Sequence, residues 1–178
     1  NSRGQRHGAE RELGGSVVAN DQRPRRRGRA LHDRAKIDGR RLAVDERSGG
    51  LRRIRIRPWA GGPDIHIDSD EPAYRMALDA NEEVASDAVR YTYTSLTTPR
   101  TTYDYDTRTG ERVLLKREPV LGDFDPSRYA TEYLWVTARD GERVPVALVY
   151  RRDLFRRDGT APLLQYGYGA YGISSDPV

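Results

Sequence analysis

The sequence has no cysteine, one methionine and only two phenylalanines among its 178 residues. Without cysteine, the chain can form no disulfide bond, no thiolate nucleophile and no cysteine-ligated metal site. It has no apolar run near the roughly 20 residues that a membrane-spanning helix requires. The segment from Asn1 to His7 also lacks the apolar core of a secretory signal. We therefore expect no membrane partner and a cytoplasmic location.

Several motifs of catalysis and metal binding are missing as well. The sequence holds no H-E-x-x-H, no G-x-S-x-G and no Walker-type phosphate loop. The three histidines share no ligand spacing, and we expect them to be exposed to solvent. They are His7, His32 and His66. Four acids beside a short predicted strand lack the compact spacing of a calcium loop and indicate a solvated turn. They are Asp64, Asp68, Asp70 and Glu71. We therefore expect no metal and no cofactor.

Positive charge is concentrated near the N-terminus of a chain whose net charge is +4. Five arginines stand close together there: Arg23, Arg25, Arg26, Arg27 and Arg29. Such a stretch can bind nucleic acid, but a solvated basic segment is the more ordinary interpretation, so we expect no nucleic-acid partner. Residues 1–36 show no hydrophobic period, and Val17-Val18 is their only pair of large apolar residues. Burial cannot offset the entropy of ordering such a segment. We expect it to be disordered or non-native, and we leave residues 1–41 unassigned.

Alternating apolar and polar residues begin near Arg41. The stretch from Leu42 to Ile56 predicts a hairpin around residues 47–50, with one apolar and one basic face. Four short strands with tight turns follow, at about residues 73–78, 89–96, 101–106 and 111–116. Eleven tyrosines suit half-buried strands with wet hydroxyls. The pattern predicts a mainly β chain in which the four strands form one blade of a β-propeller.

An irregular stretch with two prolines separates these strands from a second group. We place a linker at residues 118–126 for this reason. Beyond it, residues 129–138 and 143–151 predict a hairpin around Asp140-Gly141, because Asp-Gly is a strong hairpin signal. A short apolar strand from Pro162 to Tyr166 then leads into a glycine-rich segment.

That segment contains Gly167, Gly169 and Gly172 in the spacing G-x-G-x-x-G. A dinucleotide site needs a helix opening at the last glycine, and Ile173-Ser-Ser-Asp-Pro177 is a poor helix start. The glycines also present Tyr168 and Tyr171. A hydroxyl held rigidly at a loop tip can donate to a developing oxyanion, whereas two aromatic rings can simply pack a turn. The residues alone leave both interpretations open.

Four segments resemble the prolyl oligopeptidase family of serine peptidases, and within it the oligopeptidase B branch. They are residues 91–99 (YTYTSLTTP), 103–111 (YDYDTRTGE), 137–146 (TARDGERVPV) and 164–173 (LQYGYGAYGI). The resemblance implies the closing blades of a seven-bladed β-propeller over residues 42–117, then the first strands of an α/β-hydrolase domain over residues 127–178. It implies propeller strands in place of residues 1–36, where this chain carries its arginine-rich stretch. A divergent tail and a reading-frame error in the source sequence both account for that departure.

The resemblance also implies a site and an activity. Tyr168 matches the tyrosine whose hydroxyl helps to form the oxyanion hole, and Tyr171 matches an aromatic position that lines the substrate pocket. The serine, aspartate and histidine of the triad have no counterparts here, so the chain is expected to be an inactive fragment. The parent enzyme is expected to cleave short peptides after arginine or lysine. Two alternatives stay open: cleavage with another specificity, such as after proline, and a non-catalytic β-rich module that binds nucleic acid through its basic N-terminus. The oligomeric state is not indicated.

Overall fold

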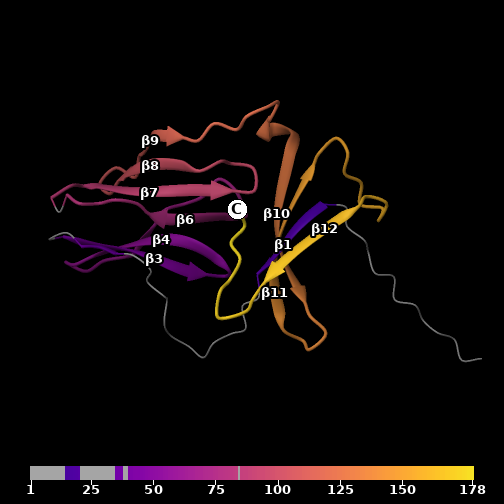
Figure 1. The fold of residues 1–178 in the computed structure, drawn as a ribbon. Helices are drawn as coiled ribbons and strands as arrows, with labels where there is room; N and C mark the ends of the chain where they lie inside the picture. Colours follow the sequence, from indigo (N-terminus) through magenta and orange to yellow (C-terminus); the bar gives the residue numbers. More distant parts are fainter. Residues whose placement is uncertain (1–14, 21–34, 38–39, 84) are drawn as a thin grey trace, which may run out of the picture.

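The computed structural model describes residues 15–20, 35–37, 40–83 and 85–178. These residues form two β sheets, one of eight and one of four strands, and one short 3-10 helix, η1, at Pro126–Arg128. The two sheets stand side by side in Figure 1, and the chain crosses from one to the other between β9 and β10. In the described part of the chain, no helix has the length and apolarity to span a bilayer.

The eight-stranded sheet has the order β2-β3-β4-β6-β7-β8-β9, with β5 paired to β4. The strands are β2 (Ala35–Ile37), β3 (Arg41–Ser48), β4 (Leu51–Pro58), β5 (Ile65–His66), β6 (Tyr74–Leu78), β7 (Ala88–Ser95), β8 (Thr101–Asp106) and β9 (Arg112–Arg117). The predicted hairpin is confirmed, since Ser48 of β3 pairs with Leu51 of β4. The predicted four-stranded blade is also confirmed as the antiparallel series β6-β7-β8-β9. A single parallel pairing, Arg52 with Arg75, joins this series to β4.

The core of this sheet follows from the alternation in sequence. Ile54 and Ile56 of β4 are fully buried, and the arginines between and beside them lie on the other face. Tyr91 of β7 is also fully buried, and its ring stacks on Tyr103 of β8 with centroids 5.6 Å apart. Burial raises the pKa of Tyr91 to about 12. The remaining buried members of the cluster are Ala43, Ile67, Met76, Leu78, Val89 and Tyr93.

The four-stranded sheet has the order β10-β11-β1-β12. Its strands are β10 (Tyr129–Thr137), β11 (Arg143–Arg151), β1 (Gly15–Asn20) and β12 (Leu163–Tyr168). The predicted β10–β11 hairpin is confirmed, with Thr137 opposite Arg143. The sheet is mixed, because β1 runs antiparallel to β11 and parallel to β12. β12 forms one edge, and all of its residues are exposed.

Strand β1 corrects the expectation that residues 1–36 lack a stable fold. Its backbone pairs with β11 on one side, from Ser16 to Ala19, and with β12 on the other side, from Gly15 to Asn20. β2 likewise adds Ala35–Ile37 to the edge of the eight-stranded sheet, so order begins before Arg41. A central strand position satisfies backbone donors and acceptors on both sides. That stabilisation comes from distant strands, and a local hydrophobic period cannot reveal it. The rest of residues 1–34 lies outside the described residues.

The two sheets touch at the turn between β3 and β4. The Tyr133 hydroxyl donates to the Gly49 carbonyl oxygen at 2.7 Å, and burial raises the pKa of Tyr133 to about 12. Gly50 has a φ of +90°, and a Cβ added there would collide with the Tyr133 hydroxyl and lie 3.0 Å from Cγ of Pro145. Glycine is required here for its backbone angle and for the space it leaves.

We expect Gly50→Ala to lower the free energy of unfolding by about 2–4 kcal/mol, because left-handed strain and overpacking combine. Thermal unfolding followed by circular dichroism measures the change. Gly62→Ala is the matched control, since Gly62 has a φ of +110° but nothing within 4 Å of an added Cβ. Equal losses in the two variants would show that backbone strain alone matters and that the sheets do not press together at Gly50.

Candidate functional site

Residues 166–172 (YGYGAYG), which we call the tyrosine–glycine segment, begin in the edge strand β12 and continue beyond its end. Tyr168 is the last residue of β12, where its backbone pairs with Asn20 of β1. Its side chain is 43% exposed and that of Tyr171 is 95% exposed. Neither ring therefore packs a buried turn among the described residues. Both side chains are available to a ligand or to another part of a larger protein.

Tyr171 is held in an unusual backbone conformation. Its φ is +55°, and no other non-glycine residue in the described ranges has a positive φ. Gly172 follows with a φ of +73°, and the Ile173 amide donates to the Ala170 carbonyl oxygen at 3.1 Å to close the turn. A bulky residue in the left-handed region costs about 1–3 kcal/mol, and such strain is common at functional sites. The turn thus fixes the backbone of Tyr171, while Tyr168 is held by the pairing of β12.

The segment after this turn does not fit a dinucleotide site. Residues 173–178 form no helix, so no helix N-terminus faces the glycines to hold a pyrophosphate. Instead the chain turns back from β12 toward the eight-stranded sheet, as the yellow segment in Figure 1 shows. There the Asp176 carboxylate meets Arg47, Arg52 and Arg75.

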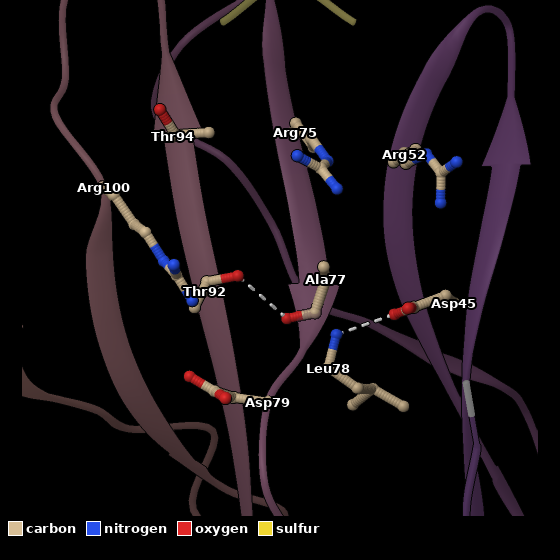
Figure 2. Close-up of a pocket in the computed structure, with 9 residues that line it drawn as sticks. All are labelled: Asp45, Arg52, Arg75, Ala77, Leu78, Asp79, Thr92, Thr94 and Arg100. Atoms are coloured by element: carbon tan, nitrogen blue, oxygen red, sulfur yellow. Dashed lines mark hydrogen bonds between the residues drawn. The ribbon is translucent and has the colours of Figure 1, made fainter. Parts of the chain in front are cut away.

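A polar cavity of about 400 Å³ opens on the eight-stranded sheet beside these arginines. Its lining residues are Asp45, Arg52, Arg75, Ala77, Leu78, Asp79, Thr92, Thr94 and Arg100. Figure 2 shows Arg52, Arg75 and Arg100 on separate strands or their ends, with the threonines between Arg75 and Arg100. Asp45 is buried and accepts a hydrogen bond from the Leu78 amide at 2.8 Å. The positive and negative side chains around the cavity offset one another, so it carries no strong charge of one sign.

Glu71 accepts hydrogen bonds from four hydroxyl groups, and the expectation that it lies in a solvated turn is wrong. Its Oε1 accepts hydrogen bonds from the Ser95 hydroxyl at 2.7 Å and from the Thr97 hydroxyl. Its Oε2 accepts from Tyr93 at 2.7 Å and from Thr98 at 2.8 Å. The carboxylate is half-buried, and these four hydroxyls enclose it.

Burial disfavours the charged form of Glu71, and the hydroxyl hydrogen bonds favour it. The hydrogen bonds from Thr97, Ser95, Tyr93 and Thr98 together outweigh burial and hold the pKa of Glu71 below its usual value. Burial, in turn, raises the pKa of Tyr93, and so does its donation to this carboxylate. The segment YTYTSLTTP therefore supplies the hydroxyl groups that surround the Glu71 carboxylate, an arrangement we call the Glu71 cage. The sequence shows this run of hydroxyl residues, but it does not indicate that Glu71 is the group they bind.

The other polar residues named from sequence lie apart from the tyrosine–glycine segment. His66 is exposed as expected, with Nε2 at 3.4 Å from Oε1 of Glu46, while His7 and His32 lie outside the described residues. Asp64 binds Arg55 and Arg57, which hold its pKa well below its usual range. Within the described ranges, no group of three or more His, Cys, Asp or Glu residues is placed to hold a metal ion.

Comparison with known proteins decides the family. Residues 23–118 match the family model described as the N-terminal β-propeller domain of prolyl oligopeptidase. The chain belongs to the prolyl oligopeptidase family. The match starts nearer to the N-terminus than the propeller start we assigned at residue 42, and it includes the arginine-rich stretch.

The relatives that this chain resembles are named as several different peptidases. The chain is 52% identical over 135 residues to dipeptidyl aminopeptidase BI of Pseudoxanthomonas mexicana, covering 75% of this chain and 18% of that protein. It is 38% identical over 139 residues to protease 2 of Moraxella lacunata, covering 77% of this chain and 19% of that protein. The chain therefore spans about a fifth of the length of these curated relatives.

Solved structures of oligopeptidase B share the fold. The oligopeptidase B of Trypanosoma brucei superposes with a TM-score of 0.71 at 28% identity, over 83% of this chain and 22% of that chain. The enzyme of Leishmania major gives a TM-score of 0.69 at 30% identity, over 83% of this chain and 22% of that chain. The resemblance to the prolyl oligopeptidase family is thus confirmed, and the eight-stranded sheet is part of its β-propeller domain.

Proposed function

We propose that this chain is part of a serine oligopeptidase that cleaves short peptides after arginine or lysine. The observation that carries the proposal is the similarity to oligopeptidase B structures across both sheets, together with the exposed tyrosine–glycine segment. On this proposal, a serine elsewhere in the protein attacks the scissile carbonyl, and a histidine moves the proton. The propeller restricts access to short, flexible peptides.

We assign two tasks within this reaction to the chain. The Tyr168 hydroxyl donates to the oxyanion that forms when the serine attacks, and the Tyr171 ring lines the pocket for the residue before the scissile bond. The exposure of both side chains and the strained turn at Tyr171 support this assignment. A donor aimed at developing charge stabilises the transition state more than the neutral substrate.

The same proposal makes the four-stranded sheet the start of an α/β-hydrolase domain. Two features support it: the sheet contains the parallel pair β1–β12, and β12 leads directly into the tyrosine–glycine segment. In such folds, functional loops follow the carboxyl ends of strands. The exposed edge strand β12 leaves backbone groups and apolar side chains for further strands of the domain.

A second specificity is favoured by one observation. The relative with 52% identity is named a dipeptidyl aminopeptidase, and an enzyme of that kind removes two residues from a free N-terminus. Such an enzyme must recognise the terminal amine, whereas an oligopeptidase accepts a blocked one. Substrates that differ only at the N-terminus therefore separate the two candidates.

We expect the full-length protein to hydrolyse an N-blocked Arg-Arg fluorogenic peptide, and the 178-residue chain to show no turnover. The chain lacks a G-x-S-x-G nucleophile motif. Both samples are assayed against the blocked peptide, the same peptide with a free amine, and a Pro-containing analogue. Hydrolysis of only the free-amine substrate would favour dipeptide release. Cleavage confined to the proline analogue would assign a post-proline specificity. Activity in the 178-residue chain above a mock purification would contradict the expectation of inactivity.

A further inference from the structure

Asp176 connects the tyrosine–glycine segment to the propeller sheet. Its Oδ1 lies 2.6 Å from Nη2 of Arg47. Its Oδ2 lies 3.2 Å from Nε of Arg52 and 3.3 Å from Nε of Arg75. The three arginines belong to β3, β4 and β6, whereas Asp176 follows β12 of the other sheet. One carboxylate thus joins four segments of the chain, which we call the Asp176 clasp.

The clasp differs from an ordinary surface ion pair. The Asp176 side chain is only 11% exposed and that of Arg47 only 18%, so solvent screens their attraction weakly. Arg47 is fixed further, because its Nη1 donates to the Gly50 carbonyl oxygen at 2.8 Å. Nearby, Tyr133 donates to Gly49 and ties the same turn to the four-stranded sheet. Removing the carboxylate would leave three guanidinium groups facing one another without their shared anion.

The clasp limits where the two tyrosines can lie. Tyr168 is anchored at the end of β12 by pairing with β1, and Asp176 is anchored on the propeller sheet. Asp176 comes five positions after Tyr171 (176 − 171 = 5), and an extended chain over five such steps reaches about 18 Å at most. The turn that carries Tyr171 is therefore pinned on both sides. Pinning of this kind reduces the number of conformations open to the segment before it meets a substrate.

We propose that Asp176 is a positioning residue that holds the segment from Tyr168 to Ile173 in its working place against the propeller. The inference rests on the proposed function in one respect: the effect on catalysis requires that Tyr168 contacts the oxyanion. The effect on the segment itself requires only the clasp. Loss of the clasp lets the hydroxyl of Tyr168 move relative to the reacting carbonyl, and displacements near 1 Å can cost up to about 100-fold in rate.

The test uses Asp176→Asn in the full-length protein, with two measurements. We expect kcat for the blocked Arg-Arg peptide to fall about tenfold with KM nearly unchanged, because substrate binding elsewhere is intact. We also expect faster amide hydrogen exchange in residues 169–175, measured by mass spectrometry. Asp176→Glu keeps the negative charge and should recover most of both properties. Asp153→Asn is the control, because Asp153 follows β11 directly and pairs at 2.6 Å with Arg151, the last residue of that strand.

A double-mutant cycle with Tyr168→Phe separates positioning from general destabilisation. If Asp176 acts through Tyr168, Asp176→Asn should cost little further rate once the hydroxyl is gone. Additive losses in the cycle would overturn the positioning role, and wild-type exchange in residues 169–175 of Asp176→Asn would overturn the clasp itself. If Tyr168→Phe alone has wild-type kcat, the assignment of Tyr168 fails. The exchange result then still decides whether Asp176 holds the segment.

Discussion

Tyr168→Phe in the full-length protein is expected to lower kcat for the proposed peptidase reaction by about 100- to 1,000-fold, with little change in KM. Loss of one oxyanion donor costs about 2.7–4 kcal/mol of transition-state stabilisation. On the proposed assignment, the Tyr168 hydroxyl interacts more strongly with the developing oxyanion than with the neutral carbonyl, and only such a difference raises kcat. The ring stays, so the end of β12 and the glycine turn should keep their structure. Steady-state kinetics with the blocked Arg-Arg peptide measure the effect.

Tyr171 provides the paired comparison for this prediction. Its side chain is almost fully exposed on a strained turn, and its proposed task needs the ring and not the hydroxyl. Tyr171→Phe should therefore change kcat and KM little, whereas Tyr171→Ala should chiefly raise KM. A wild-type kcat in Tyr168→Phe, with chemistry shown to be rate-limiting by single-turnover kinetics, would remove Tyr168 from the oxyanion hole. The tyrosines would then be surface residues of a turn.

Local sequence pattern predicts the strands whose burial alternates. Ile54 and Ile56 point to one face and the intervening arginines to the other, so the amino-acid sequence alone is sufficient to predict the β3–β4 hairpin. The blade from β6 to β9 is predictable for the same reason, helped by turns at its strand ends. Within such a meander, each strand pairs with its neighbour in sequence, and local information is sufficient.

Contacts between distant segments could not be predicted in this way. β1 pairs with strands more than 100 residues away along the chain (143 − 20 = 123), and nothing in its composition announces those partners. In the sequence, Asp176 is noticeable only as part of a poor helix start. A helix pattern depends on neighbouring residues and carries no information about partners far along the chain. Its three arginines come from strands that the fold, and not the sequence, brings together. Polar residues of the candidate site can thus be found by type, while their partners are set by the tertiary structure.

Glu71→Gln is expected to destabilise the propeller blade by about 2–4 kcal/mol at neutral pH. Four hydroxyls donate to the Glu71 carboxylate. Hydrogen bonds to a charged group contribute about 1.5–3 kcal/mol each when taken singly, and bonds that share one acceptor group do not add. The amide of glutamine is neutral and turns two donors toward groups that were themselves donating. Urea unfolding followed by circular dichroism measures the loss. Glu111→Gln, in an exposed turn of the same blade, is the control and should be nearly silent.

The Glu71 cage also predicts how the difference in unfolding free energy between wild type and Glu71→Gln depends on pH. The pKa of Glu71 is lower in the folded state than in the unfolded chain, so the unfolded chain binds the proton more readily. The stabilisation is therefore fully present above the unfolded pKa, near pH 4–5, and is lost as pH falls through the folded pKa. The gap in unfolding free energy should stay constant from pH 7 to about pH 5 and shrink below it. A difference in unfolding free energy that does not change down to pH 3 would show that the stabilisation does not depend on the charge of Glu71.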